Sequence, residues 1–99
     1  MKTGIELIAE ERKRQIEEEG WTKEHDAVHT RGELAKAAAA YALPPLCRAD
    51  YAPDIAAAPF MWPWNKSFWK PVPNDRIREL VKAGALIAAE IDRLQNQQP

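Results

Sequence analysis

The sequence has little of what several protein classes require. Cysteine occurs once in 99 residues, at Cys47. A disulfide framework is therefore excluded, and the thiol is expected to be a small packing residue in a reducing compartment. No apolar run approaches the ~20 residues of a membrane span, and the opening MKTGIELIAEERKR lacks the apolar core of a signal peptide. We expect a cytoplasmic protein without membrane contact.

The chain also lacks an excess of either charge. It has 14 basic and 15 acidic residues, for a formal net charge of −1. No global field draws it to DNA, RNA or an anionic membrane, so nucleic acid polymers are not expected partners and any nucleotide contact must be local. Neither a phosphate-cradling glycine-rich loop nor a Ser-His-Asp pattern is present. The sequence assigns no catalytic residue, no metal ligand and no cofactor.

Alternating strand patterns are absent too, and helical spacing takes their place. We predict helices at about residues 3–20, 31–43 and 75–95, joined by a Pro/Trp-rich strap over 44–73. The expected fold is an all-α single domain, 1–99, built as a small bundle of three main helices with the strap as a long ordered loop. Because so short a chain buries only a modest core, we expect oligomerisation to complete the bundle and a homo-oligomer to form.

Local signals place the helix ends. Thr3 and Glu6 have the spacing of a capping box, and Gly20 suits the end of the first helix. Thr30 and Glu33 repeat the capping-box spacing before the second helix. The third helix is expected to begin at a capping Asn74 or Asp75.

The last helix has the clearest apolar periodicity in the chain. Its apolar residues fall on one face: Ile77, Leu80, Val81, Gly84, Ile87, Ala88, Ile91 and Leu94. A glycine in a helix interior costs about 1 kcal/mol relative to alanine, so Gly84 indicates a close helix crossing. The alanines around it make a contact between subunits one candidate for that crossing.

Aromatic residues concentrate within the strap. The segment 59–73, PFMWPWNKSFWKPVP, holds three of the four tryptophans and both phenylalanines. Its prolines exclude a helix, so the indole rings must be covered by the core, by a partner or by a ligand. Indole faces stack on bases, and neighbouring cations bind phosphates. The candidate ligand-binding residues here are Trp62, Trp64, Trp69, Lys66, Lys70, Arg76 and Arg78. One or two of the three tryptophans are expected in the core.

The turn between the first two helices carries a second group of candidates. Trp21 follows Gly20 and is expected to pack on the last helical turn. His25 and His29 would share a face if the turn were helical, and could then hold a metal with Asp26, but a hydrogen-bonding role is favoured. We expect Trp21, Asp26 and His29 to close a ligand site formed with the strap.

Several short motifs resemble those of a family of small phage and prophage proteins. They are ERKRQ from Glu11 to Gln15, EGWT from Glu19 to Thr22, HDAVH from His25 to His29, GELA from Gly32 to Ala35, WPW from Trp62 to Trp64, WKP from Trp69 to Pro71, and ELVKAGALIAAEIDRL from Glu79 to Leu94. The resemblance covers nearly the whole chain. It implies a viral or prophage origin and an infected or lysogenic bacterial host.

Two analogies suggest activities. Counter-defence sponges of phages hold cyclic nucleotide or ADP-ribose-type immune signals without cleaving them, and a stacking strap beside arginines suits that function. We therefore expect an anti-defence sequestering protein and favour a function other than catalysis.

MazG-like all-α pyrophosphohydrolases are the enzymatic alternative, since they hold magnesium with paired carboxylates on facing helices. This sequence departs from their pattern, because Glu33 stands alone and Glu90 and Asp92 lie at i,i+2. A third alternative is an inhibitor that binds a host protein through the aromatic strap.

Overall fold

The computed structural model describes residues 1–54 and 56–97 of the chain. It confirms the all-α class, and no strand occurs within those two ranges. The α-helices are α1 (Gly4–Glu19), α2 (Lys23–Ala27), α3 (Glu33–Ala42) and α4 (Arg76–Asn96), and the 3-10 helices η1 (Pro45–Asp50) and η2 (Lys66–Phe68) lie within the strap. Across the described part of the chain, no helix combines the length and the apolar character that a membrane span requires.

The helix ends follow local chemistry at three of the four predicted signals. The Thr3 hydroxyl accepts from the Glu6 N–H, which completes the predicted capping box, and Gly20 ends α1 with a φ of 72°. Asp75 caps α4, as expected. The capping box predicted at Thr30 is wrong. Gly32, with a φ of 78°, turns the chain into α3 instead, and the Glu33 carboxylate accepts from a backbone N–H nearby.

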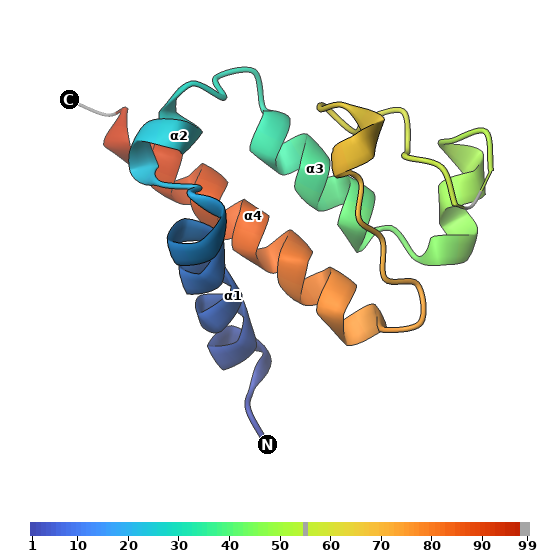
Figure 1. Ribbon diagram of the computed structural model, residues 1–99, viewed down its shortest axis with the longest axis horizontal. Coiled ribbons are helices and arrows are strands. Elements are labelled where there is room, and N and C mark those ends of the chain that lie inside the picture. Colours follow the sequence, from blue (N-terminus) through green and yellow to red (C-terminus); the bar gives the residue numbers. More distant parts are fainter. Residues whose placement is uncertain (55, 98–99) are drawn as a thin grey trace.

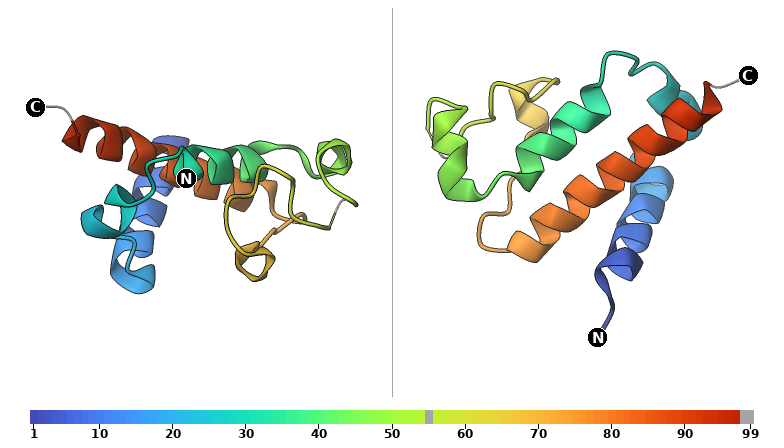
Figure 2. Two further views of the ribbon diagram at one scale, coloured as in Figure 1. Left: turned by 90° about the horizontal axis from the view of Figure 1, so that it is seen from above. Right: turned by 180° about the vertical axis from the view of Figure 1, so that it is seen from behind.

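The helices α3 and α4 form a layer, and other elements project from one side of it. α3 and α4 lie side by side and run antiparallel (Figure 1). α1 crosses α4 near its middle, and α2 lies beside the C-terminal half of α4. Viewed from above, α2 and η2 project to the same side of the α3–α4 layer (Figure 2, left).

Small residues form the contact between α3 and α4. The core consists largely of alanines from the two helices, together with Leu34 and Leu86: Ala37, Ala38, Ala40, Ala83 and Ala89. Alanines allow the helix axes to approach closely. The alanine run of α3 is thus buried against α4.

The buried face of α4 differs from the apolar face that the sequence suggests. Five of the six leucine and isoleucine side chains of the helix are exposed: Ile77, Leu80, Ile87, Ile91 and Leu94. The buried positions are instead occupied by alanines, Leu86, Val81 and two charged residues, Glu79 and Arg93. The periodicity predicted the helix correctly, but the larger side chains do not face α3, because that helix packs against alanines.

Gly84 marks the crossing of α1 over α4. A Cβ atom at this position would lie 2.5 Å from Cδ1 and 2.8 Å from Cγ1 of Ile8, closer than atoms can pack. The close crossing predicted from the glycine is therefore present, and α1 of the same chain makes it.

Replacing Gly84 by valine is expected to destabilise the protein by about 1–3 kcal/mol, the usual cost of overpacking. The measurement is urea unfolding followed by far-UV circular dichroism. The same substitution in an Ile8→Ala background removes the clash and should recover most of the loss. Equal losses in the two backgrounds would show that the cost arises from helix propensity and not from the crossing.

A buried arginine connects the strap to the helices. Arg48 of η1 is 0% exposed and donates to the Ala40 and Tyr41 carbonyl oxygens at the end of α3. It also pairs with Glu79 of α4 at 2.9 Å and lies 5.1 Å from the Trp69 ring centroid. One guanidinium thus joins α3, α4 and the strap.

Glu79 receives further donors beside Arg48. The Val72 N–H and Arg76 each lie 3.0 Å from its carboxylate oxygens. Burial opposes ionisation, but these hydrogen bonds prevail and hold the pKa of Glu79 below its ordinary value.

Cys47, which precedes Arg48 in η1, is exposed. The packing role that was expected for its thiol is therefore wrong.

Candidate functional site

A cleft of about 550 Å³ opens between α1, the α2 turn and the strap. Aromatic and imidazole rings supply seven of its fifteen lining residues: Trp21, His25, His29, Tyr41, Trp62, Trp64 and Phe68. They come from three separate parts of the chain, namely the α2 turn, α3 and the strap. The volume lies within the range of small-molecule sites.

The rings contact one another in a continuous series. Trp21 stacks on His25 with an interplanar angle of 2° and centroids 6.0 Å apart. Trp64 connects this pair to the strap, with its centroid 6.2 Å from Trp21 and 5.4 Å from His29. Trp62 then meets Trp64 edge to face at 5.3 Å. Because each ring is held by its neighbours, the wall is preorganised.

Two lysines occupy the rim beside the aromatic wall. Lys82 of α4 places Nζ 3.1 Å from the Lys70 carbonyl oxygen and 5.3 Å from the Tyr41 ring centroid. Burial, together with the nearby charges of Arg78 and Arg14, lowers the pKa of Lys82. Among residues 1–54 and 56–97, no carboxylate forms an ion pair with Lys70 or Lys82. Both ammonium groups are available to an anion.

The α1 side of the cleft is polar, and its charges are already paired. Arg14 donates two hydrogen bonds to Glu11, at 2.8 and 2.9 Å, and one to Glu19 at 3.0 Å. Arg78 approaches Glu11 from α4 at 2.7 Å. Burial acts against the charge of Glu11, yet the two arginines hold its pKa below the ordinary value. These groups join α1 to α4 beneath the cleft.

Gln15 offers a polar atom that lacks a partner. Its side chain is 2% exposed, lines the cleft and donates from Nε2 to Glu11 at 3.2 Å. Since Glu11 is ionised and can only accept, the amide group is oriented with Oε1 away from it. Oε1 has no hydrogen-bond partner in the described structure. A buried acceptor without a donor is unfavourable, and a ligand N–H group would relieve this cost.

The structure brings half of the predicted binding residues to this cleft. Trp21, His29, Trp62, Trp64 and Lys70 line it, although they are distant in the sequence. Trp21 is also half-buried and donates its backbone N–H to the Gln15 carbonyl oxygen, in agreement with the packing expected after Gly20.

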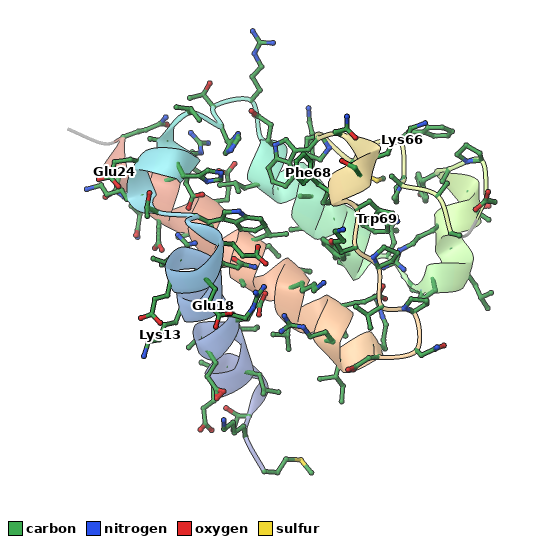
Figure 3. All side chains as sticks on the ribbon, in the orientation of Figure 1. Lys13, Glu18, Glu24, Lys66, Phe68 and Trp69 are labelled. Carbon is green, nitrogen blue, oxygen red and sulfur yellow. The ribbon has the colours of Figure 1, made fainter. Side chains whose placement is uncertain are left out.

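Two predicted strap residues lie outside the cleft. Trp69 is buried behind the wall, where it stacks on Tyr41 at 4.7 Å and covers Arg48. Lys66 is exposed on η2, while Phe68 on the same short helix reaches the cleft (Figure 3). The expectation that some strap tryptophans belong to the core agrees with the position of Trp69.

The other three predicted residues are engaged inside the fold. Arg76 donates to the Tyr41 and Ala42 carbonyl oxygens and to Glu79, so it closes the end of α3. Arg78 pairs with Glu11, as described above. Asp26 is buried and binds Arg12 at 2.9 Å and His25 Nδ1 at 3.0 Å. Asp26 therefore positions a cleft residue without lining the cleft.

The α2 turn is helical, so the two histidines come together. The His25 and His29 rings meet edge to face at 4.9 Å, and His29 Nδ1 lies 3.4 Å from Glu33. In the two described ranges, no three side chains of His, Cys, Asp or Glu gather as a metal site would require. The histidines act here as wall residues held by carboxylates.

Sequence patterns did not indicate several cleft residues. Gln15 and Tyr41 lie on helix faces whose orientation depends on tertiary packing, and Phe68 was counted only as part of the aromatic density. The position of Lys82 could have been predicted from its spacing. It lies four residues from Arg78 and four from Leu86, so it shares their side of α4.

Comparison of the chain with protein-family models, with curated proteins and with solved structures finds no match. The chemistry of the cleft therefore has to be argued from its own residues.

Proposed function

We propose that the protein binds a nucleotide in this cleft and sequesters it without cleavage, as a phage-derived sponge for a cyclic nucleotide or an ADP-ribose-type immune signal. The observation that carries the proposal is the combination of a preorganised aromatic wall with two lysines that form no ion pair with a carboxylate of the described residues. A flat ring with an attached anion fits both features.

The base would stack on the indole rings. Trp64 and Trp21 present ring surface at the cleft, and stacking on an aromatic residue contributes about 1–3 kcal/mol per base. Lys70 and Lys82 would bind the phosphate through charge-assisted hydrogen bonds. The free Oε1 of Gln15 would accept from an amino group of the base, which favours adenine over its 6-oxo analogue hypoxanthine.

The state of the carboxylates supports sequestration over hydrolysis. The pyrophosphohydrolase alternative requires carboxylates that are free to bind magnesium. Glu11 is bound by two arginines, Glu79 by Arg48 and Arg76, and Glu90 by Arg93 at 2.6 Å. Sequestration needs only affinity, and the wall and lysines can supply it.

The test is isothermal titration with cyclic di- and trinucleotides, cyclic ADP-ribose isomers and dNTPs, followed by chromatography of each mixture. Tight binding with intact ligand is the expected result. Turnover of a dNTP with magnesium would establish the enzymatic alternative instead. Absence of binding across the panel would overturn the proposal and favour a protein partner of the strap.

Lys82→Gln is expected to weaken binding of a phosphorylated ligand about 10- to 100-fold, the effect of losing a charge-assisted hydrogen bond worth about 1.5–3 kcal/mol. The matched control is Lys66→Gln, because Lys66 is an exposed lysine of η2 that does not line the cleft. Because the pKa of Lys82 is lowered, its ammonium group loses its charge at a lower pH than an ordinary lysine does. As the pH is raised, the affinity for the ligand should therefore begin to fall earlier. Equal effects of the two substitutions would remove Lys82 from the site.

A further inference from the structure

The outer face of α4 is an exposed apolar stripe. Its large side chains are about half exposed or more: Ile77 68%, Leu80 47%, Ile87 48%, Ile91 50% and Leu94 47%. Seen from behind, α4 runs across the near side of the molecule, and α1 meets it near its middle, where Ile8 contacts Gly84 (Figure 2, right). Isolated exposed aliphatic residues are common, but five in one row on one helix are not.

The stripe lies away from the cleft. Lys82 and Leu86 line the cleft, and at 100° per residue they lie on the opposite side of α4 from Leu80, Ile87 and Ile91. A partner on the stripe would therefore leave the cleft open. The inference that follows is independent of the proposed nucleotide site.

The spacing of the stripe is symmetric along the chain. Ile77, Leu80, Gly84, Ile87, Ile91 and Leu94 follow one another at intervals of three, four, three, four and three residues. The intervals read the same in both directions about a centre between residues 85 and 86. This 3-4 repeat is the apolar seam of a helix pair. In an antiparallel pair of identical helices, Ile77 would face Leu94 and Leu80 would face Ile91.

No charged residue interrupts this stripe, and its centre is filled by the same chain. Ile8 of α1 occupies the space above Gly84, so it supplies an aliphatic side chain where the glycine has none. The charged residues of α4 lie on its other faces, several of them paired with α1 or η1. A partner must therefore be apolar and matched to the same spacing, and a second copy of α4 meets both conditions.

The size of the stripe fits a stable dimer. Five aliphatic side chains at this exposure present roughly 500 Å² of apolar surface, a size at which patches on small proteins are often functional. If about 57–65% of the interface is apolar, this patch corresponds to roughly 770–880 Å² per partner. A standard interface buries about 800 Å² per partner.

We propose that the protein forms a two-fold symmetric homodimer in which the outer faces of two α4 helices pack antiparallel. The contact is isologous, so it closes on itself and leaves no apolar stripe for further copies. The two clefts then open on opposite sides of the dimer.

Sedimentation velocity of the full chain tests the assembly. We expect a species of about twice the 11.2 kDa chain mass at micromolar concentration. Ile87→Arg and Ile91→Arg should each shift it to monomer with an unchanged helical circular dichroism spectrum. Leu46→Arg is the matched control, because Leu46 is 81% exposed on η1, outside the stripe, and should leave the dimer intact. A monomeric wild-type protein, or a dimer insensitive to both stripe variants, would overturn the proposal.

Single cysteines test the antiparallel register in a Cys47→Ser background. With the centre between residues 85 and 86 and a rise of 1.5 Å per residue, the two copies of position 87 are offset by about 4.5 Å along the axis and those of position 94 by about 25 Å. Ile87→Cys should therefore form a disulfide-linked dimer on mild oxidation, whereas Leu94→Cys should not. Equal crosslinking at both positions would indicate parallel helices and contradict the arrangement.

Discussion

Arg48→Met is expected to lower the free energy of unfolding by about 3–5 kcal/mol, the usual cost of removing one member of a buried ion pair. The variant retains the aliphatic volume of the side chain but removes every donor that Arg48 supplies. Glu79 loses its 2.9 Å ion pair, and the Ala40 and Tyr41 carbonyl oxygens lose their donors. Urea unfolding at neutral pH, followed by circular dichroism, measures the effect.

A double variant separates the charge from the packing. Arg48→Met combined with Glu79→Met removes both buried ions, and replacing a buried pair by apolar residues is often close to neutral. We therefore expect the double variant to be more stable than Arg48→Met alone. A double variant less stable than the single one would show that the carbonyl contacts of Arg48 matter more than its ion pair.

The same ion pair gives an expected pH dependence. Because the pKa of Glu79 is lowered in the folded state, its ionisation stabilises the fold above the unfolded-state pKa of about 4.3. This contribution is lost as the pH falls through the lower folded-state pKa. The difference in stability between wild type and Arg48→Met should therefore be largest near neutral pH and should shrink in acid. A constant difference from pH 7 to pH 3 would contradict this role of Glu79.

Trp64→Ala is expected to weaken nucleotide binding about 10- to 100-fold, because stacking contributes about 1–3 kcal/mol per base. Trp64 connects the strap to Trp21 and His29, so its loss also removes support from both neighbouring rings. Titration calorimetry measures the change for whichever ligand of the panel the wild type binds.

Two further variants make the result specific to the ring. Trp64→Phe keeps an aromatic surface and should lose only part of the affinity. Phe60→Ala is the control, since Phe60 is an exposed strap aromatic outside the cleft and its removal should leave binding unchanged. If all three variants bind like wild type, the stacking role of the wall is refuted.

Local signals in the sequence predicted the helices well. Thr3, Gly20 and Asp75 act through contacts within a few residues, so their effects can be read without the fold. The start of α3 was misplaced because Gly32 competes with Thr30, and no local rule decides between them. The apolar periodicity of α4 did not indicate which face packs against α3, because alanines and Leu86 form most of that contact.

The cleft could be predicted only in part. Aromatic density and prolines identified the strap, and the turn after Gly20 supplied Trp21. The sequence did not show that Trp64 lines the cleft while Trp69 lies in the core, because the position of Trp69 depends on contacts with Arg48 and Tyr41, which lie elsewhere in the sequence. Arg48 gave no signal, because a single arginine among prolines and alanines is usually exposed. Arg76 and Arg78 were expected to bind phosphate, whereas their neighbours in space are carbonyl oxygens and Glu11.

The series of indole rings also has an optical consequence. All four tryptophans belong to one group in which neighbouring centroids lie 5.1 to 6.2 Å apart. Rings this close couple their electronic transitions, so the near-ultraviolet circular dichroism and the intrinsic fluorescence of the chain both arise largely from this group, three of whose rings line the cleft. A molecule entering the cleft would change these signals directly, and the native protein carries its own spectroscopic reporter of occupancy.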